Sequence, residues 1–170
     1  MGTTGTADAR QVPWLTGEQQ EHWRALVALV MTLPAALDAQ LKRDAGMNTF
    51  EYHVLVALAA SDHGVVPMSD LAVLAQGSPS RLSHAVSRLE RAGWVERVTC
   101  HEAGRRTSAR LTAAGDDKLR ATAPGHVREA RRLVVDALDA DQLTALATAA
   151  RTIVDAAVPA ACDGSCDPGS

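Results

Sequence analysis

A turn followed at once by a helix start, at residues 76–79, most constrains how this chain can fold. The Gln-Gly pair favours a tight turn. Ser78 followed by Pro79 then predicts a helix, because serine caps free N–H groups and proline fits the first turn. This helix is expected to run to Ala92, and another, over residues 68–75, precedes the turn. The chain therefore contains two short helices joined by a tight turn.

The neighbouring segments complete a recognisable order of elements. Asn48 with a glutamate three residues later predicts a capped helix that ends near residue 62, and residues 65–67 predict a very short strand. Residues 94–99 and 107–111 are β-like around a polar, basic turn, which predicts a hairpin. Helix, helix, turn, helix and hairpin in this order describe a winged helix-turn-helix.

Composition favours a mainly α fold around this small hairpin wing. The 170 residues include one Phe, one Tyr and three Trp, so Ala, Leu and Val must fill the core. Such a core favours helices packed on helices and disfavours an all-β sandwich. The length suggests one compact domain with short tails, or a domain with a dimerisation arm.

A long helix is predicted before this segment. Thr16 and Gln19 form a capping box, and the helix is expected to bend or break at Pro34 and to stop at Gly46. The longest nearly apolar run, residues 25–37, has 13 residues and two interruptions, so we expect no membrane span. With no apolar signal segment at the N-terminus, the sequence predicts a cytoplasmic protein.

Two further helices are predicted after the hairpin. Thr112 caps a helix that runs to about Ala137, and the Pro-Gly pair at 124–125 should kink or interrupt it. Residues 138–143 combine a capping box with a hydrophobic staple and open a last helix that ends near Val158.

Charge is distributed unevenly along the chain. Residues 68–112 carry a net charge of +3, while the rest of the chain carries −6. A basic segment in an acidic protein can mark an anionic partner, and an ordinary solvated surface is the alternative.

The helix that begins after Ser78 is predicted to have two faces. Leu82, Val86 and Leu89 form an apolar stripe that packs inward, whereas arginines, serines and a histidine form a separate stripe. A helix with such a stripe fits the major groove of B-DNA, where arginine pairs with guanine or neutralises phosphate. The candidate DNA-binding residues on this helix are Ser78, Ser80, Arg81, Ser83, His84, Ser87, Arg88 and Arg91.

The tip of the hairpin, residues 101–106, is the second candidate DNA contact. It carries Arg105 and Arg106, and an arginine on such a wing can enter a narrow minor groove. A solvated loop is the alternative.

Together these segments resemble the MarR family of bacterial transcription regulators. The resemblance rests on the order and spacing of short motifs: Met68-Ser69-Asp70-Leu71-Ala72, Ser80-Arg81-Leu82-Ser83-His84, Arg88 to Val95, and Leu111-Thr112-Ala113-Ala114-Gly115. It extends more loosely over residues 16–158. It implies a homodimeric regulator, with repression as the expected mode, on a pseudo-palindromic double-stranded DNA operator with half-sites about 10–10.5 bp apart or a multiple of that.

Two positions depart from the family pattern. The family's wing usually has an aspartate shortly before its arginine, and here Ala103 or Gly104 stands in that place. The division of roles between Arg105 and Arg106 is therefore open. Pro67 replaces the usual hydroxyl cap before the third helix.

The resemblance also implies that the end helices interleave with those of a partner. The chain then divides into a flexible arm (1–13), a dimerisation helix region (14–46), the winged domain (47–112), dimerisation helices (113–158) and a flexible tail (159–170). These end helices are strongly apolar, and an intrachain core is the alternative use of their surface.

Many members of the family release DNA when a small molecule enters a cleft between the dimerisation helices and the winged domain. The candidate ligand-binding residues are Trp14, His22, Trp23, Tyr52 and His53. The alternative is that Trp23 and Tyr52 belong to the core and that the histidines lie on the surface.

Other chemistry has less support. Cys100, Cys162 and Cys166 fit neither a disulfide scaffold nor a zinc site, and a cysteine-based redox-responsive regulator stays an alternative. Nucleotide-binding, metalloprotease and hydrolase motifs are missing from the sequence, so we expect no enzyme, cofactor or metal. A winged-helix module that binds proteins is the other alternative. The salt dependence of binding distinguishes DNA binding from protein binding, because the affinity for phosphate falls steeply as salt is raised.

Overall fold

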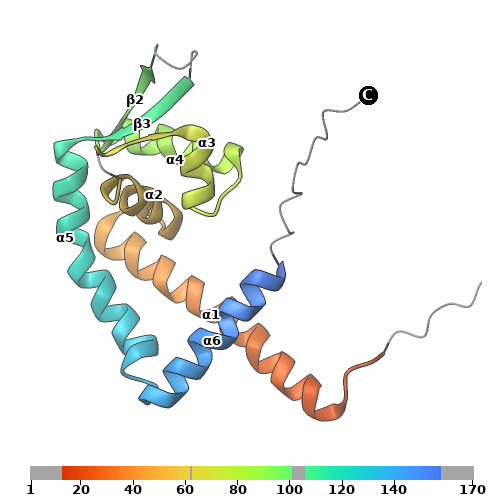
Figure 1. The fold of residues 1–170 in the computed structure, drawn as a ribbon. Helices are drawn as coiled ribbons and strands as arrows, with labels where there is room; N and C mark the ends of the chain where they lie inside the picture. Colours follow the sequence, from red (N-terminus) through yellow and green to blue (C-terminus); the bar gives the residue numbers. More distant parts are fainter. Residues whose placement is uncertain (1–12, 62, 101–105, 158–170) are drawn as a thin grey trace, which may run out of the picture.

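The computed structural model describes residues 13–61, 63–100 and 106–157, and this part of the chain is mainly helical with one small sheet (Figure 1). The elements in chain order are α1 (Gly17–Ala45), α2 (Thr49–Ala59), β1 (Val65–Pro67), α3 (Met68–Leu74), α4 (Pro79–Arg91), β2 (Val95–Cys100), β3 (Arg106–Leu111), α5 (Ala113–Ala130), the π-helical turn η1 (Arg131–Val135) and α6 (Ala140–Ala157). The predicted winged helix-turn-helix is confirmed.

The predicted caps set the starts of the helices. Asn48 Oδ1 accepts the Glu51 N–H at 2.9 Å, and the Glu51 carboxylate accepts the Asn48 N–H at 2.9 Å in return. At the start of α4, Ser78 Oγ accepts the Arg81 N–H at 3.2 Å, and Pro79 occupies the first position. The other predicted caps that the structure confirms are Thr16, Thr112 and Asp139.

The sheet is antiparallel, in the strand order β1-β3-β2. The short predicted strand β1 is confirmed and pairs with β3, with Val66 opposite Ala109. Strands β2 and β3 form the hairpin, with Val98 opposite Ser108. The strand β2 therefore lies at an edge of the sheet, on the side away from β1.

The core lies where α2, α3, α4 and the sheet meet. Leu55, Leu71 and Val86 are fully buried there, and Val95 of β2 is 2% exposed. The helix α1 joins this core only through its last turns, where Leu41 is fully buried.

Neither proline breaks its helix, so of the two outcomes that the sequence predicts at each proline, a break is wrong and a bend stays a prediction. Pro34 lies inside the continuous helix α1, and α5 continues through Pro124. A proline removes one backbone hydrogen bond and costs about 3 kcal/mol, which the hydrogen bonds of the remaining turns of a long helix can offset. The α-helical geometry of α5 ends only at Ala130, where the π-helical turn η1 begins.

The N-terminal part of α1 and the whole of α6 extend away from the winged part of the chain (Figure 1). None of the residues of α6 is buried, and Val30 of α1 and Val154 of α6 are 59% and 56% exposed. Pro34 does not interrupt α1, and judged by length and composition alone this helix could cross a membrane. Within the chain, only 11% of its most apolar stretch is buried. The chain by itself thus leaves a large apolar surface uncovered.

The start of α5 packs tightly against the end of α4. Thr112 Oγ1 donates to the Gly93 carbonyl at 2.7 Å, and the Thr112 N–H donates to the Trp94 carbonyl at 3.1 Å. Gly115 lies so close to this point that a Cβ would overlap the Trp94 carbonyl and would come within 2.8 Å of Leu111 Cδ1. The contact fixes the direction in which α5 leaves the winged part.

We expect Gly115→Ala to lower the free energy of unfolding by roughly 1–3 kcal/mol, because the backbone carbonyl that it meets cannot move aside freely. Gly17→Ala is the matched control, since a Cβ there meets open space. Urea denaturation of both variants measures the difference. Equal stability of the two variants would show that the junction is not tightly packed.

Candidate nucleic-acid interface

The helix α4 has the two predicted faces. Leu82, Val86 and Leu89 are at most 1% exposed, and they anchor the helix on the core. The predicted polar stripe lies outside this row, with Arg81, His84, Arg88 and Arg91 all exposed. The basic side chains are therefore available to an anionic partner.

The stripe spreads over three sides of the helix. At 100° per residue, Ser80, His84 and Arg91 point most directly away from the buried row. Arg81 and Arg88 lie on the flank next to α2, where both have contacts with that helix. The flank that carries Ser83 and Ser87 faces strand β2.

Arg81 is held against an aromatic ring. Its guanidinium carbon lies 4.2 Å from the centre of the Phe50 ring, a cation–π contact. The same ring lies against Gly77, where a Cβ would overlap it. Gln76, beside it, has a φ of 53°, so this turn adopts a conformation that L-residues rarely take. The turn, Phe50 and the first arginine of α4 thus form one packed unit.

Arg88 pairs with a buried carboxylate. Its Nε lies 2.8 Å from Glu51 Oε1, and the Glu51 side chain is 3% exposed while that of Arg88 is 57% exposed. Glu51 is fixed independently, because its other oxygen caps α2. The pair orders the Arg88 side chain and leaves its outer end in solvent.

Two serines of the stripe, Ser78 and Ser87, already have hydroxyl partners within the chain. The Ser78 hydroxyl accepts the Arg81 N–H, and the Ser87 hydroxyl accepts a hydrogen bond from Arg97 at 3.1 Å. A hydroxyl can still donate its own proton, so both residues stay candidates for a DNA contact. Arg91 Nε donates to the Ser87 carbonyl at 3.2 Å, which orients its side chain along the helix.

The tip of the wing lies outside the described residues, and Arg105 with it. Arg106 opens β3 opposite Cys100, the last residue of β2. Cys162 and Cys166 also fall outside the described part of the chain. The roles expected for the two wing arginines stay predictions.

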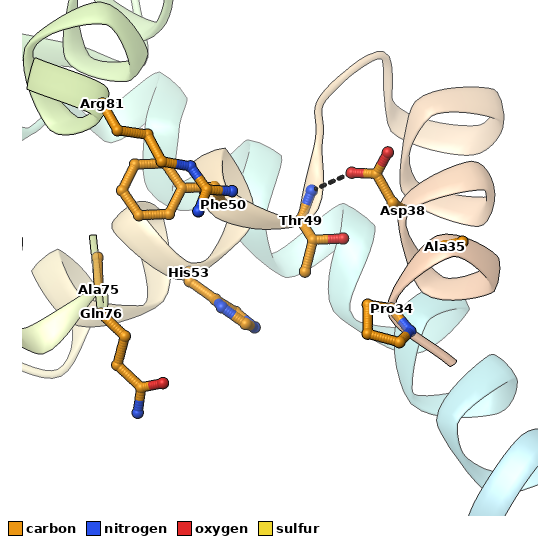
Figure 2. Close-up of a pocket in the computed structure, with 9 residues that line it drawn as sticks. All are labelled: Pro34, Ala35, Asp38, Thr49, Phe50, His53, Ala75, Gln76 and Arg81. Carbon is orange, nitrogen blue, oxygen red and sulfur yellow. Dashed lines mark hydrogen bonds between the residues drawn. The ribbon is translucent and has the colours of Figure 1, made fainter. Parts of the chain in front are cut away.

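A cavity of about 450 Å³ lies between α1, α2 and the turn before α4 (Figure 2). His53 points into it, and Arg81 covers Phe50 at one side. Asp38, on the α1 side, accepts the Thr49 N–H at 2.9 Å. Lys42, 2.7 Å away, holds the pKa of Asp38 below its usual range, and the Thr49 bond lowers it further. The cavity thus offers a carboxylate, an imidazole and a guanidinium.

The structure does not bring the predicted ligand-binding residues together around this cavity. His53 lines it, but Tyr52, 8% exposed, is part of the core, as the alternative interpretation held. Trp14 and Trp23 are 87% and 56% exposed and, like His22, belong to the region at the start of α1. Of the five predicted ligand-binding residues, His53 alone lines this cavity within one chain.

A polar contact that the sequence did not predict joins α1, α2 and α5. The rings of Tyr52 and His126 lie 4.6 Å apart, and His126 Nδ1 is 3.3 Å from Oε1 of Gln40, which is 2% exposed. Burial lowers the pKa of His126, and the nearby His53 lowers it further. Burial also raises the pKa of Tyr52.

Residues 13–61, 63–100 and 106–157 contain no group of three or more His, Cys, Asp or Glu side chains that could hold a metal ion. The candidate site that the contacts above describe is the basic surface of α4 with the neighbouring cavity.

Comparison with known proteins agrees with this geometry. The model of the MarR family matches residues 45–106. Sco3205, a MarR family transcriptional regulator from Streptomyces coelicolor solved in complex with DNA, is 43% identical, with a TM-score of 0.83, over 86% of this chain and 96% of its own. AbsC, a MarR family regulator from the same organism, is 35% identical, with a TM-score of 0.80, over 86% of this chain and 98% of its own. No curated protein sequence matched the chain.

We expect stability to fall as the pH is lowered through the range in which an unfolded histidine takes up a proton, near pH 6.5. The folded state favours neutral His126, so this residue contributes fully to the free energy of unfolding above that pH. The contribution is lost as the pH falls below it, because the unfolded chain takes up the proton first. Denaturation between pH 7.5 and 5 measures the effect. His126→Gln should flatten the pH dependence, whereas the control His22→Gln, at an exposed site, should keep it. Parallel curves for all three proteins would contradict this role.

Proposed function

The chain belongs to the MarR family of transcriptional regulators, and from this membership we propose that it binds a specific double-stranded DNA operator as a homodimer. It acts as a cytoplasmic repressor on a pseudo-palindromic site, and a small-molecule effector releases it. The observation that carries the proposal is the exposed polar stripe of α4. The other face of the same helix is buried in the core, and the β2–β3 wing lies next to it.

The geometry of α4 supports groove reading. Ser80, His84 and Arg91 point outward, and their side chains are short enough or flexible enough to let the helix approach base edges and phosphates. Arg81 and Arg88 flank this line and are already ordered by Phe50 and Glu51. An ordered arginine loses less conformational entropy when it binds, which favours affinity.

The uncovered apolar surface of α1 and α6 supports the homodimer. Large apolar side chains are exposed on both helices, namely Trp23, Val27, Leu29, Val30 and Met31 on α1 and Ile153 and Val154 on α6. Apolar patches of this kind mark association sites. A second copy of the chain offers the same helices, so a two-fold arrangement covers both surfaces at once. It also places two copies of α4 on one face of a DNA duplex.

The cavity beside α4 supports release by an effector. It is bounded by α1 on one side and by Arg81 on the other, so an occupant contacts both the proposed dimer helix and a proposed DNA-binding residue. An acidic molecule would engage Arg81 and His53, and would compete with DNA for the same guanidinium.

Selection from a random duplex library tests the central claim. The full chain should enrich a pseudo-palindrome, and fluorescence anisotropy should show tighter binding to it than to a scrambled duplex, with affinity that falls steeply as salt is raised. A library that stays unenriched, with equal binding to every duplex, would contradict sequence-specific regulation. Salt-insensitive binding to another protein would favour the interaction module instead.

Within that assay, we expect Arg91→Ala to weaken binding to operator and scrambled duplexes alike and to reduce the salt slope by about 2, because it removes one phosphate contact from each of the two protomers. Arg120→Ala is the charge-matched control. The Arg120 side chain is 77% exposed on α5 and pairs with Asp116. An unchanged affinity for Arg91→Ala would show that α4 does not face the duplex as proposed.

We expect Val154→Asp to dissociate the dimer and to abolish operator binding, because it places a charge in the apolar surface of α6. Val73→Asp is the matched control, since Val73 is 77% exposed on α3, outside the proposed interface. Analytical ultracentrifugation at micromolar concentration compares them. A dimer that survives Val154→Asp would contradict the proposed interface.

A further inference from the structure

The side chain of Arg97 reaches from the wing to α4. Its Nη2 donates to the Ser83 carbonyl and to the Ser87 hydroxyl, both at 3.1 Å, and its Nη1 forms an ion pair with Glu90. The backbone N–H of Arg97 also donates to Glu90 Oε1 at 3.0 Å. One residue of the wing thus contacts α4 at three positions.

These contacts follow from where Arg97 lies. Strand β2 is at the edge of the sheet, so an N–H that points away from β3 needs another partner, and Glu90 provides it. Residues 83, 87 and 90 are spaced four and three apart, so they form one row along the helix. The planar guanidinium presents several donors in a fixed geometry and can bridge such a row, whereas an ammonium group is a single point charge.

A second arginine of the sheet provides a contrast. Arg110 of β3 pairs with Glu96, directly opposite on β2, at 3.1 Å. Both of these side chains are about half exposed, whereas those of Arg97 and Glu90 are 30% and 28% exposed. The Arg110 pair joins two strands that are already paired, and the Arg97 pair joins two different elements.

We propose that Arg97 is a positioning residue that holds the wing at a fixed angle to α4, so that both elements meet the same DNA site together. The inference rests on the proposed function, because it assigns a role within DNA recognition. Arg97 has little freedom to bind phosphate itself, since both Nη2 hydrogens and Nη1 already serve acceptors on α4. Its effect on DNA passes through the geometry of the two elements that it joins.

The first test measures DNA binding. Fluorescence anisotropy compares the wild-type chain, Arg97→Met, Arg97→Lys and the charge-matched control Arg110→Met on the selected operator and on its scramble. We expect Arg97→Met to weaken operator binding by about tenfold or more relative to Arg110→Met, with equal binding of both variants to the scramble. Arg97→Lys keeps the charge but cannot bridge the three acceptors, so it should lose most of the same preference.

The second test needs no DNA. Hydrogen exchange should show faster exchange of the β2 amides in Arg97→Met, including the Arg97 N–H that Glu90 accepts, while Arg110→Met leaves that amide protected. If Arg97→Met fails to fold, Arg97→Lys and Glu90→Gln make the same comparisons, because each weakens the bridge and keeps the arginine or its charge.

The outcomes separate this inference from the proposed function. A wild-type chain that prefers no duplex would refute the proposed function, and hydrogen exchange alone would then decide whether Arg97 joins the wing to α4. A wild-type chain with a clear operator preference, together with equal losses in Arg97→Met and Arg110→Met on both duplexes, would refute the positioning role. Unchanged exchange of β2 in Arg97→Met would refute it as well.

Discussion

The rest of the structure depends on the burial of one row of α4. Leu82, Val86 and Leu89 are fully removed from solvent, and each such side chain contributes roughly 1.5–3 kcal/mol. The two ion pairs of α4 involve the buried carboxylate of Glu51 and the partly buried carboxylate of Glu90, and the cost of removing such charges from water offsets much of their attraction. The apolar row therefore decides which side of the helix faces the core. The opposite side must then face solvent, and its arginines and histidine become a surface that an anionic partner can reach.

The ion pairs of α4 mainly orient side chains. Glu51 is buried, and a buried carboxylate without a partner is costly, so Arg88 is kept beside it. Arg97 similarly satisfies Glu90 and two groups of α4 at once. These contacts add little to the net free energy of folding, but they restrict where an arginine or a wing strand can lie. Orientation of this kind favours selective DNA recognition over non-specific attraction.

Local signals predicted the elements, and tertiary contacts escaped them. The Ser78-Pro79 start and the Asn48 capping box lie within a few residues of the groups they cap, so the sequence shows them directly. The helix breaks expected at Pro34 and Pro124 do not occur, because a long helix keeps the backbone hydrogen bonds of the turns on either side of a proline. The contacts of Arg81 with Phe50 and of Arg97 with Ser87 join residues that are distant in the sequence and meet only in the folded chain. Patterns of residue spacing therefore could not predict them.

The helix α1 connects the proposed dimer to the proposed DNA surface. Its last turns belong to the core of the winged part through Leu41, whereas Val30 and the turns before it are exposed. The cavity lined by Asp38 and His53 lies beside this transition, and its far wall is Arg81. A shift of α1 relative to α2 must therefore change the same space that supports the first arginine of α4. A coupling between the proposed dimer and the proposed DNA surface would need no long chain of contacts, because one cavity is lined by both elements.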